Sequence, residues 1–104
     1  MPVDQQLTLE VARMIRVYFL QQNGFDPVDA YSGVEQQYAM ARAILTFQEE
    51  AKKAMAAGAV LEDVVNVPAR IELMRARFAE GYLEKIEGLV EEMVSQIGNS
   101  VEAQ

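Results

Sequence analysis

The longest uninterrupted helical pattern in the sequence covers residues 33–57 and sets the scale of the fold. Its apolar side chains recur every three or four residues in one stripe: Met40, Ile44, Phe47, Ala51 and Met55. About 25 residues at 1.5 Å per residue give a helix of about 37 Å. Ser32 followed by Glu35 has the form of a capping box, and Gly58 suits the end of a helix. Because such a helix is longer than a small core requires, we expect its far end, residues 56–59, to project.

Other helical patterns lie on either side of this one. Residues 4–22 are predicted to form a helix with Asp4 as its N-cap, and most of its circumference is apolar. Shorter helices are predicted over residues 60–66 and 69–78, and a long amphipathic helix over residues 79–97. Proline is scarce and runs of β-branched residues are short. The sequence therefore predicts an all-α fold, a bundle of four to five helices with one long amphipathic helix pair plus shorter helices.

The 104 residues suffice for a single helical domain, 1–104, with one modest core. Residues 98–104 offer little apolar surface, so we expect them to form a loose tail. The one basic stretch carries Arg70, Arg75 and Arg77, which we expect to form a solvated face, with a partner-binding surface as the alternative. Five glutamates follow the outer side of the last helix: Glu80, Glu84, Glu87, Glu91 and Glu92. Plain solvation explains them, and an acidic surface that faces a basic partner is the alternative.

The composition excludes several kinds of site. The chain has no cysteine and no histidine, which removes disulfides, thiolate metal sites and histidine-based catalysis. No glycine-rich phosphate loop is present, and we predict no catalytic residue and no metal site. The net charge of −7 argues against nucleic acid or an anionic membrane surface as a direct partner. No apolar run approaches the roughly 20 residues of a membrane span.

Residues 19–29 interrupt the helical pattern with the sequence Phe-Leu-Gln-Gln-Asn-Gly-Phe-Asp-Pro-Val-Asp. Gly24 and Pro27 break a helical hydrogen-bond ladder, and Asn23 tolerates a left-handed backbone. Amides beside an aromatic ring suit a flat, hydrogen-bonding ligand, and they also suit a capped corner between two helices. The spacing alone leaves both interpretations open.

This string, together with the preceding Leu-Glu-Val-Ala-Arg-Met-Ile-Arg at residues 9–16, resembles one family. The chain is similar to the C-terminal helical domain of the catalytic A subunit (alpha chain) of archaeal and bacterial A/V-type ATP synthases. The resemblance covers residues 4–97 and is strongest over residues 9–29. It implies that the chain is a C-terminal fragment of a larger catalytic subunit, whose phosphate-binding loop lies upstream. The fragment alone is then not an enzyme, whereas the parent subunit belongs to an H⁺/Na⁺-transporting two-sector ATPase.

The resemblance also implies roles for individual residues and partners. Phe25 is expected to pack on the adenine ring at the edge of the ATP site, and Gln21 to make a nearby polar contact. Glu62 and Asp63 are the candidate contacts to the rotor. No cofactor is expected in the fragment, and ATP or ADP with Mg belongs to the parent subunit. Expected partners are the nucleotide-binding domain of the same subunit, neighbouring non-catalytic B subunits and the central rotor stalk.

In the assembled enzyme such a domain is expected on the cytoplasmic side of the cell membrane, as a peripheral part of the ATP synthase head without direct membrane insertion. There it couples nucleotide state to the rotor and so to proton or sodium transport. A free-standing acidic helical interaction module, unrelated to ATP, is the alternative. An excised domain is further expected to expose an apolar face near Tyr18, Phe19 and Phe25, where its neighbour is missing.

Overall fold

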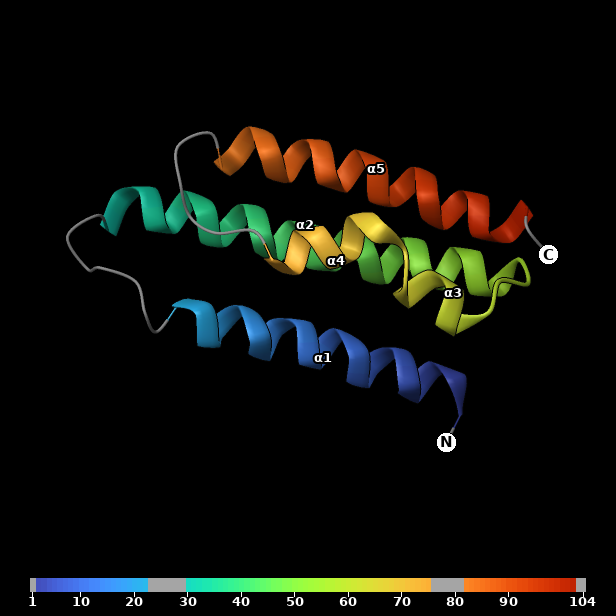
Figure 1. Cartoon of the computed structure of the whole chain (residues 1–104). Coiled ribbons are helices and arrows are strands. Elements are labelled where there is room, and N and C mark those ends of the chain that lie inside the picture. Colours follow the sequence, from blue (N-terminus) through green and yellow to red (C-terminus); the bar gives the residue numbers. More distant parts are fainter. Residues whose placement is uncertain (1, 23–29, 76–81, 103–104) are drawn as a thin grey trace.

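The computed structural model describes residues 2–22, 30–75 and 82–102. These residues form helices α1 (Val3–Gln22), α2 (Ala30–Ala56), α3 (Leu61–Val65), α4 (Pro68–Arg75) and α5 (Tyr82–Glu102). Figure 1 shows that α1, α2 and α5 run along the length of the molecule, with the short helices α3 and α4 beside them. The molecule measures 47 × 27 × 16 Å. The all-α bundle predicted from the sequence is confirmed.

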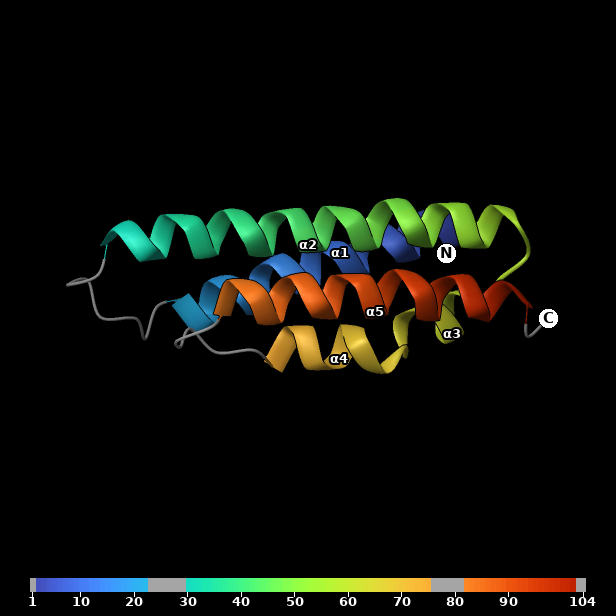
Figure 2. The same cartoon turned by 90° about the horizontal axis from the view of Figure 1, so that it is seen from above.

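Helices α2 and α5 are the central elements of the bundle, because α2 packs against α1, α3 and α5, and α5 packs against α2, α3 and α4. Figure 2 shows α2 and α5 side by side and running in the same direction. The predicted stripe on α2 is buried at Met40, Ile44, Phe47 and Ala51. The predicted capping box is wrong, because α2 already begins at Ala30 and Ser32 therefore lies inside the helix.

Helix α1 buries one face and leaves the other exposed. Its buried residues are Leu7, Val11, Met14 and Tyr18, which recur at helical spacing. Leu9 and Ile15 are exposed, so the helix is covered on one side only. The prediction of an exposed apolar surface near Tyr18 is wrong for Tyr18 itself, which packs into the core. The side chain of Phe19 and all of Phe25 lie outside the described residues.

The end of the chain corrects a second prediction. Residues 98–102 are not a loose tail, since α5 continues through Gly98 to Glu102. Ile97 is buried, Val101 packs against the core, and the Ser100 hydroxyl donates a hydrogen bond of 2.6 Å to the Ile97 carbonyl. A glycine inside a helix costs only about 1 kcal/mol relative to alanine, and burial of the neighbouring apolar side chains offsets this.

Candidate functional site

The helix ends next to the two segments that the sequence singles out lie at opposite ends of the bundle (Figure 1). The end of α1 and the start of α2, which flank the corner at residues 23–29, lie at one end. The turn from α2 into α3 lies at the other end, close to the C-terminal end of α5 (Figure 2). Helix α2, with 27 residues, spans the distance between them.

The α2–α3 turn is built by a helix stop in which glycine is required. The Gly58 backbone has φ = 110°, a conformation that side-chain-bearing residues rarely adopt. The N–H of Gly58 donates to the Met55 carbonyl at 3.1 Å, and the N–H of Ala59 donates to the Ala54 carbonyl at 2.9 Å. This pair of bonds is the Schellman arrangement that closes a helix. The expected projection is partly wrong, because Ala54 and Ala59 are buried where α3 folds back against α2, and only residues 56–58 between them are exposed.

Glu62 and Asp63 stand in the first turn of α3, and both side chains are exposed. Val64, the next residue, is completely buried and fixes the orientation of α3 on the bundle. The N–H groups of Asp63 and Val64 donate to the Val60 carbonyl at 3.1 and 3.2 Å, which ties the start of the helix to the turn. The structure thus presents two adjacent carboxylates on a firmly anchored helix at one tip of the molecule.

The nucleotide contact expected from Gln21 and Phe25 remains a prediction. Gln21 lies in the last turn of α1, but its side chain is outside the described part of the chain. Phe25 is also outside the described residues. The proposed adenine-end contact of these two residues is therefore neither confirmed nor contradicted.

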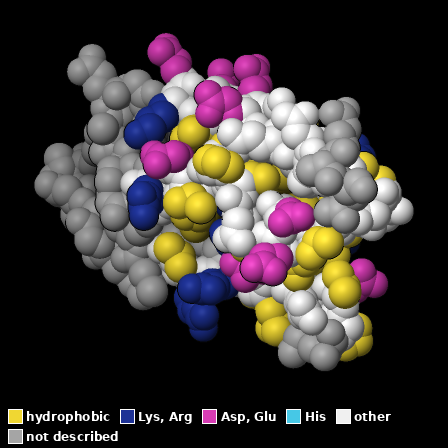
Figure 3. Space-filling view, turned by 45° about the vertical axis from the view of Figure 1, so that its right-hand side comes forward, with side chains coloured by type: hydrophobic (Ala, Val, Ile, Leu, Met, Phe, Trp, Pro, Cys, Tyr) yellow, Lys and Arg dark blue, Asp and Glu magenta, His cyan; other side chains and the backbone are white. Residues whose placement is uncertain are grey.

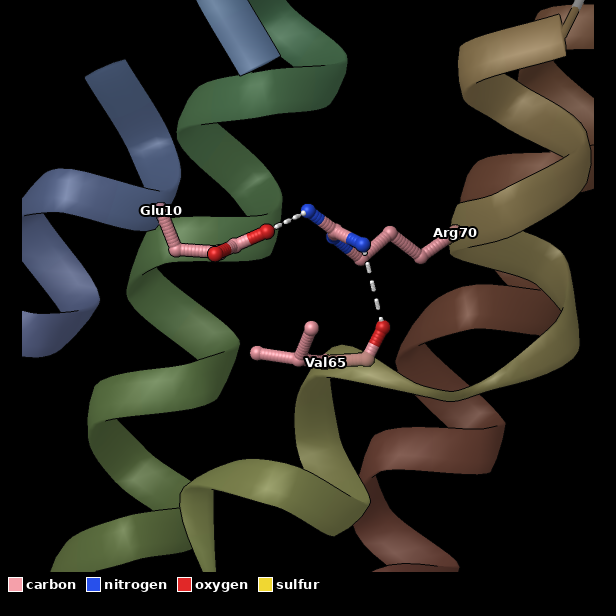
Figure 4. Close-up of polar contacts among 3 residues, drawn as sticks. All are labelled: Glu10, Val65 and Arg70. Atoms are coloured by element: carbon pink, nitrogen blue, oxygen red, sulfur yellow. Dashed lines mark hydrogen bonds and ion pairs between the residues drawn. The ribbon is translucent and has the colours of Figure 1, made fainter. Parts of the chain in front are cut away.

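Arg70 is a structural residue that sequence reasoning assigned to a solvated face, and that prediction is wrong. Its guanidinium forms an ion pair with Glu10 of α1 and donates a hydrogen bond of 3.2 Å to the Val65 carbonyl at the end of α3. Figure 4 shows the Glu10 and Arg70 side chains pointing toward each other from α1 and α4. The guanidinium carbon also lies 5.3 Å from the centroid of the Phe47 ring on α2. One side chain therefore joins four helices.

The environment of Arg70 shifts its pKa in opposite directions. Burial lowers the pKa of Arg70, the charge and hydrogen bond of Glu10 raise it, and the nearby positive charge of Arg13 lowers it further. The Nε of Arg70 is buried without a hydrogen-bond partner among the described residues. Glu10 is 60 residues away in sequence, so no local pattern could have revealed this pair.

Within residues 2–22, 30–75 and 82–102, no group of three or more acidic side chains is arranged to hold a metal ion. None of the helices in these ranges is both long enough and apolar enough to cross a membrane. What the structure does present is an acidic, rod-like helical bundle with a rigid turn at one tip.

The family described as the C-terminal domain of V and A type ATP synthase matches residues 1–65. The chain belongs to this family. No solved structure matches it at a significant level.

Curated relatives agree with the family. An A subunit of the A-type ATP synthase of Methanospirillum hungatei is 36% identical over 99% of this chain and 18% of its own length. The A subunit of the A-type ATP synthase of Natronomonas pharaonis is 45% identical over 93% of this chain and 17% of its own length. The V-type ATP synthase alpha chain 1 of Clostridium tetani is 42% identical over 74% of this chain and 13% of its own length. The chain spans less than a fifth of each of these relatives, and the family resemblance seen in the sequence is confirmed.

Proposed function

We propose that this domain couples the nucleotide state of an A/V-type ATP synthase catalytic subunit to the central rotor, and so to transmembrane transport of protons or sodium. The observation that carries the proposal is the position of Glu62 and Asp63. They are exposed on an anchored helix at one end of a molecule 47 Å long, and the end of α1 and the start of α2 lie at the opposite end. A rigid rod with one contact at each end can transmit a tilt from the nucleotide site to the rotor.

The architecture suits a mechanical role because the long helices are continuous between the two tips. Helix α2 contains 27 residues and α5 contains 21, and both share the buried core. Close-packed cores have low compressibility and transmit displacement. Arg70 adds a polar tie that holds α1, α3 and α4 together beside α2. A push at the α3 tip is then resisted by the whole bundle rather than absorbed by a local bend.

In this proposal the chain acts only as part of its parent subunit. ATP or ADP with Mg binds in the parent's nucleotide-binding domain, which is the first partner of this domain, and the fragment alone does not hydrolyse ATP. Neighbouring B subunits and the rotor stalk are the other partners. The location is the cytoplasmic side of the cell membrane, peripheral, within the ATP synthase head.

The rotor contact is tested by reversing the two carboxylates in the complete enzyme. The Glu62→Lys/Asp63→Lys variant should retain ATP hydrolysis but transport fewer ions per ATP, because repulsion replaces attraction to basic residues of the stalk. The matched control is Glu72→Lys/Glu92→Lys, which makes the same charge change at exposed positions on α4 and α5. An unchanged ratio of ions to ATP in the first variant would remove Glu62 and Asp63 from the rotor contact.

The adenine contact has a separate test. Phe25→Ala in the complete subunit should raise the KM for ATP with little loss of folding, since stacking on a base typically contributes about 1–3 kcal/mol. Phe25→Tyr, which keeps the aromatic face, should restore most of the affinity. An unchanged KM in Phe25→Ala would exclude this residue from the nucleotide pocket.

A further inference from the structure

A groove runs along the flank of the bundle between the N-terminal halves of α2 and α5. It has a volume of about 730 Å³ and is bounded by residues between Glu35 and Thr46 on α2 and between Leu83 and Glu91 on α5. The 12 residues of the α2 wall extend over about 17 Å at 1.5 Å per residue, or about three helical turns. The groove is therefore as long as a short helix.

The floor of the groove is apolar and includes large side chains that the bundle leaves uncovered. Tyr38 on α2 is 65% exposed, and Leu83 on α5 is 39% exposed. Ala39, Ile86 and Val90 also line the groove, from the two helices. An amphipathic helix can lay its apolar face into an apolar groove of this length. The shape and the apolar floor are those of a helix-binding groove.

The rim of the groove is charged unequally. Glu87 and Glu91 stand on the α5 wall, and Glu35 with Arg42 stands on the α2 wall. No ion pair joins Arg42 to these carboxylates among the residues that the structure describes. The rim therefore carries a net charge of about −2, and its α5 side is purely acidic. Figure 3 shows another face, on which acidic side chains lie along the upper edge, in the centre and at the lower right, and most of the visible basic ones gather at the left.

We infer that this groove binds an amphipathic helix of a different polypeptide, with an apolar ridge and Lys or Arg along the edge that faces α5. The apolar ridge covers Tyr38 and Leu83, and the basic edge meets Glu87 and Glu91. A second copy of this chain is disfavoured as the occupant because each copy carries a net charge of −7. The inference goes beyond the coupling role, since the groove lies on the flank of the rod and includes neither Glu62 nor Asp63.

The probe is a synthetic amphipathic helix of about four turns, with leucines on one face and lysines on both edges, and it carries a fluorophore for anisotropy measurements. The full chain should bind this peptide, and a peptide with glutamate in place of lysine should bind at least about 10-fold more weakly. Glu87→Lys/Glu91→Lys should lose the lysine peptide and prefer the glutamate peptide. Glu72→Lys/Glu92→Lys, with the same charge change outside the groove, should bind like the unmodified chain.

The apolar contact is tested on its own by Tyr38→Ala, which should weaken binding by about 10-fold while leaving thermal unfolding unchanged, because this ring is mostly exposed. Equal binding of the lysine peptide by Glu87→Lys/Glu91→Lys and the unmodified chain would overturn the inference, as would no binding of either peptide. A dimer of the unmodified chain in sedimentation, dissolved by Glu87→Lys/Glu91→Lys, would make the occupant a second copy and also overturn it. Peptide binding does not depend on ion transport per ATP, so failure of this inference leaves the coupling proposal standing.

Discussion

Removal of the Glu10 carboxylate tests the claim that Arg70 holds the short helices on the bundle. In the Glu10→Ala variant the Arg70 guanidinium keeps only its bond to the Val65 carbonyl and its position over the Phe47 ring. Its Nε already lacks a partner among the described residues, and Arg13 adds repulsion. The variant therefore leaves a positive charge in a protein environment without a counter-charge.

The expected cost follows from the burial of the pair. The side chains of Arg70 and Glu10 are 12% and 21% exposed. Breaking a fully buried ion pair costs about 3–5 kcal/mol, and the partial access of water lowers this to about 2–3 kcal/mol. For a domain of this size, such a loss lowers the melting temperature by more than about 10 °C.

The assay is urea unfolding followed by circular dichroism, with Glu50→Ala as the matched control. Glu50 pairs with Lys53 at 3.5 Å, but the Lys53 side chain is 74% exposed, so this change should cost at most about 0.5 kcal/mol. In an Arg70→Met background, Glu10→Ala should also cost less than about 1 kcal/mol, because no buried cation remains. If Glu10→Ala and Glu50→Ala unfolded at the same urea concentration, the structural role given to the Glu10–Arg70 pair would be refuted.

Three further predictions concern the backbone, the core and pH. Gly58→Ala should lower the unfolding free energy by about 1–3 kcal/mol, because alanine is strained at φ = 110°. Gly98→Ala should raise the unfolding free energy by about 0.5–1 kcal/mol, because alanine favours a helix and the added Cβ meets no atom within 4 Å. If urea titration showed no change for Gly98→Ala, that result would argue against a helical C-terminus. Phe47→Ala should cost about 3–5 kcal/mol in the same titration, since this ring is completely buried; a cost under about 1 kcal/mol would contradict its place in the core. Burial raises the pKa of Tyr18 to about 12 from 10.0. The stability that depends on the protonated form of Tyr18 is therefore intact below pH 10 and is lost as the pH rises toward 12. Tyr18→Phe should reduce this loss of stability at high pH, and an identical loss in the variant would exclude Tyr18 as its cause.

The sequence predicted the helices in which apolar residues recur every three or four positions and are buried. The stripe from Met40 to Ala51 on α2 and the amphipathic pattern of α5, which buries Ile86, Met93 and Ile97, were recognisable because helical spacing is set within one segment. The last helix was predicted to stop at residue 97, just before Gly98. A glycine often ends a helix, but here the burial of Ile97 and the packing of Val101 keep α5 continuous.

The candidate sites were predictable only in part, for a physical reason. The exposed position of Glu62 and Asp63 follows from their place beside a helix stop, which Gly58 signals in the sequence. The Glu10–Arg70 pair and the groove between α2 and α5 depend on how distant segments pack. Such contacts have no local period, so a single sequence does not contain a recognisable signal for them.

The coupling proposal is tested most directly by the movement of the α3 tip in the assembled enzyme. The chain contains no cysteine, so Glu62→Cys gives this domain a single site for a fluorescent label. The distance from this label to a second label on the rotor stalk can then be followed by single-molecule energy transfer. We expect the distance to switch between discrete values as ATP binds and is hydrolysed. One constant distance through all nucleotide states, in an enzyme that still hydrolyses ATP, would contradict the role proposed for this domain.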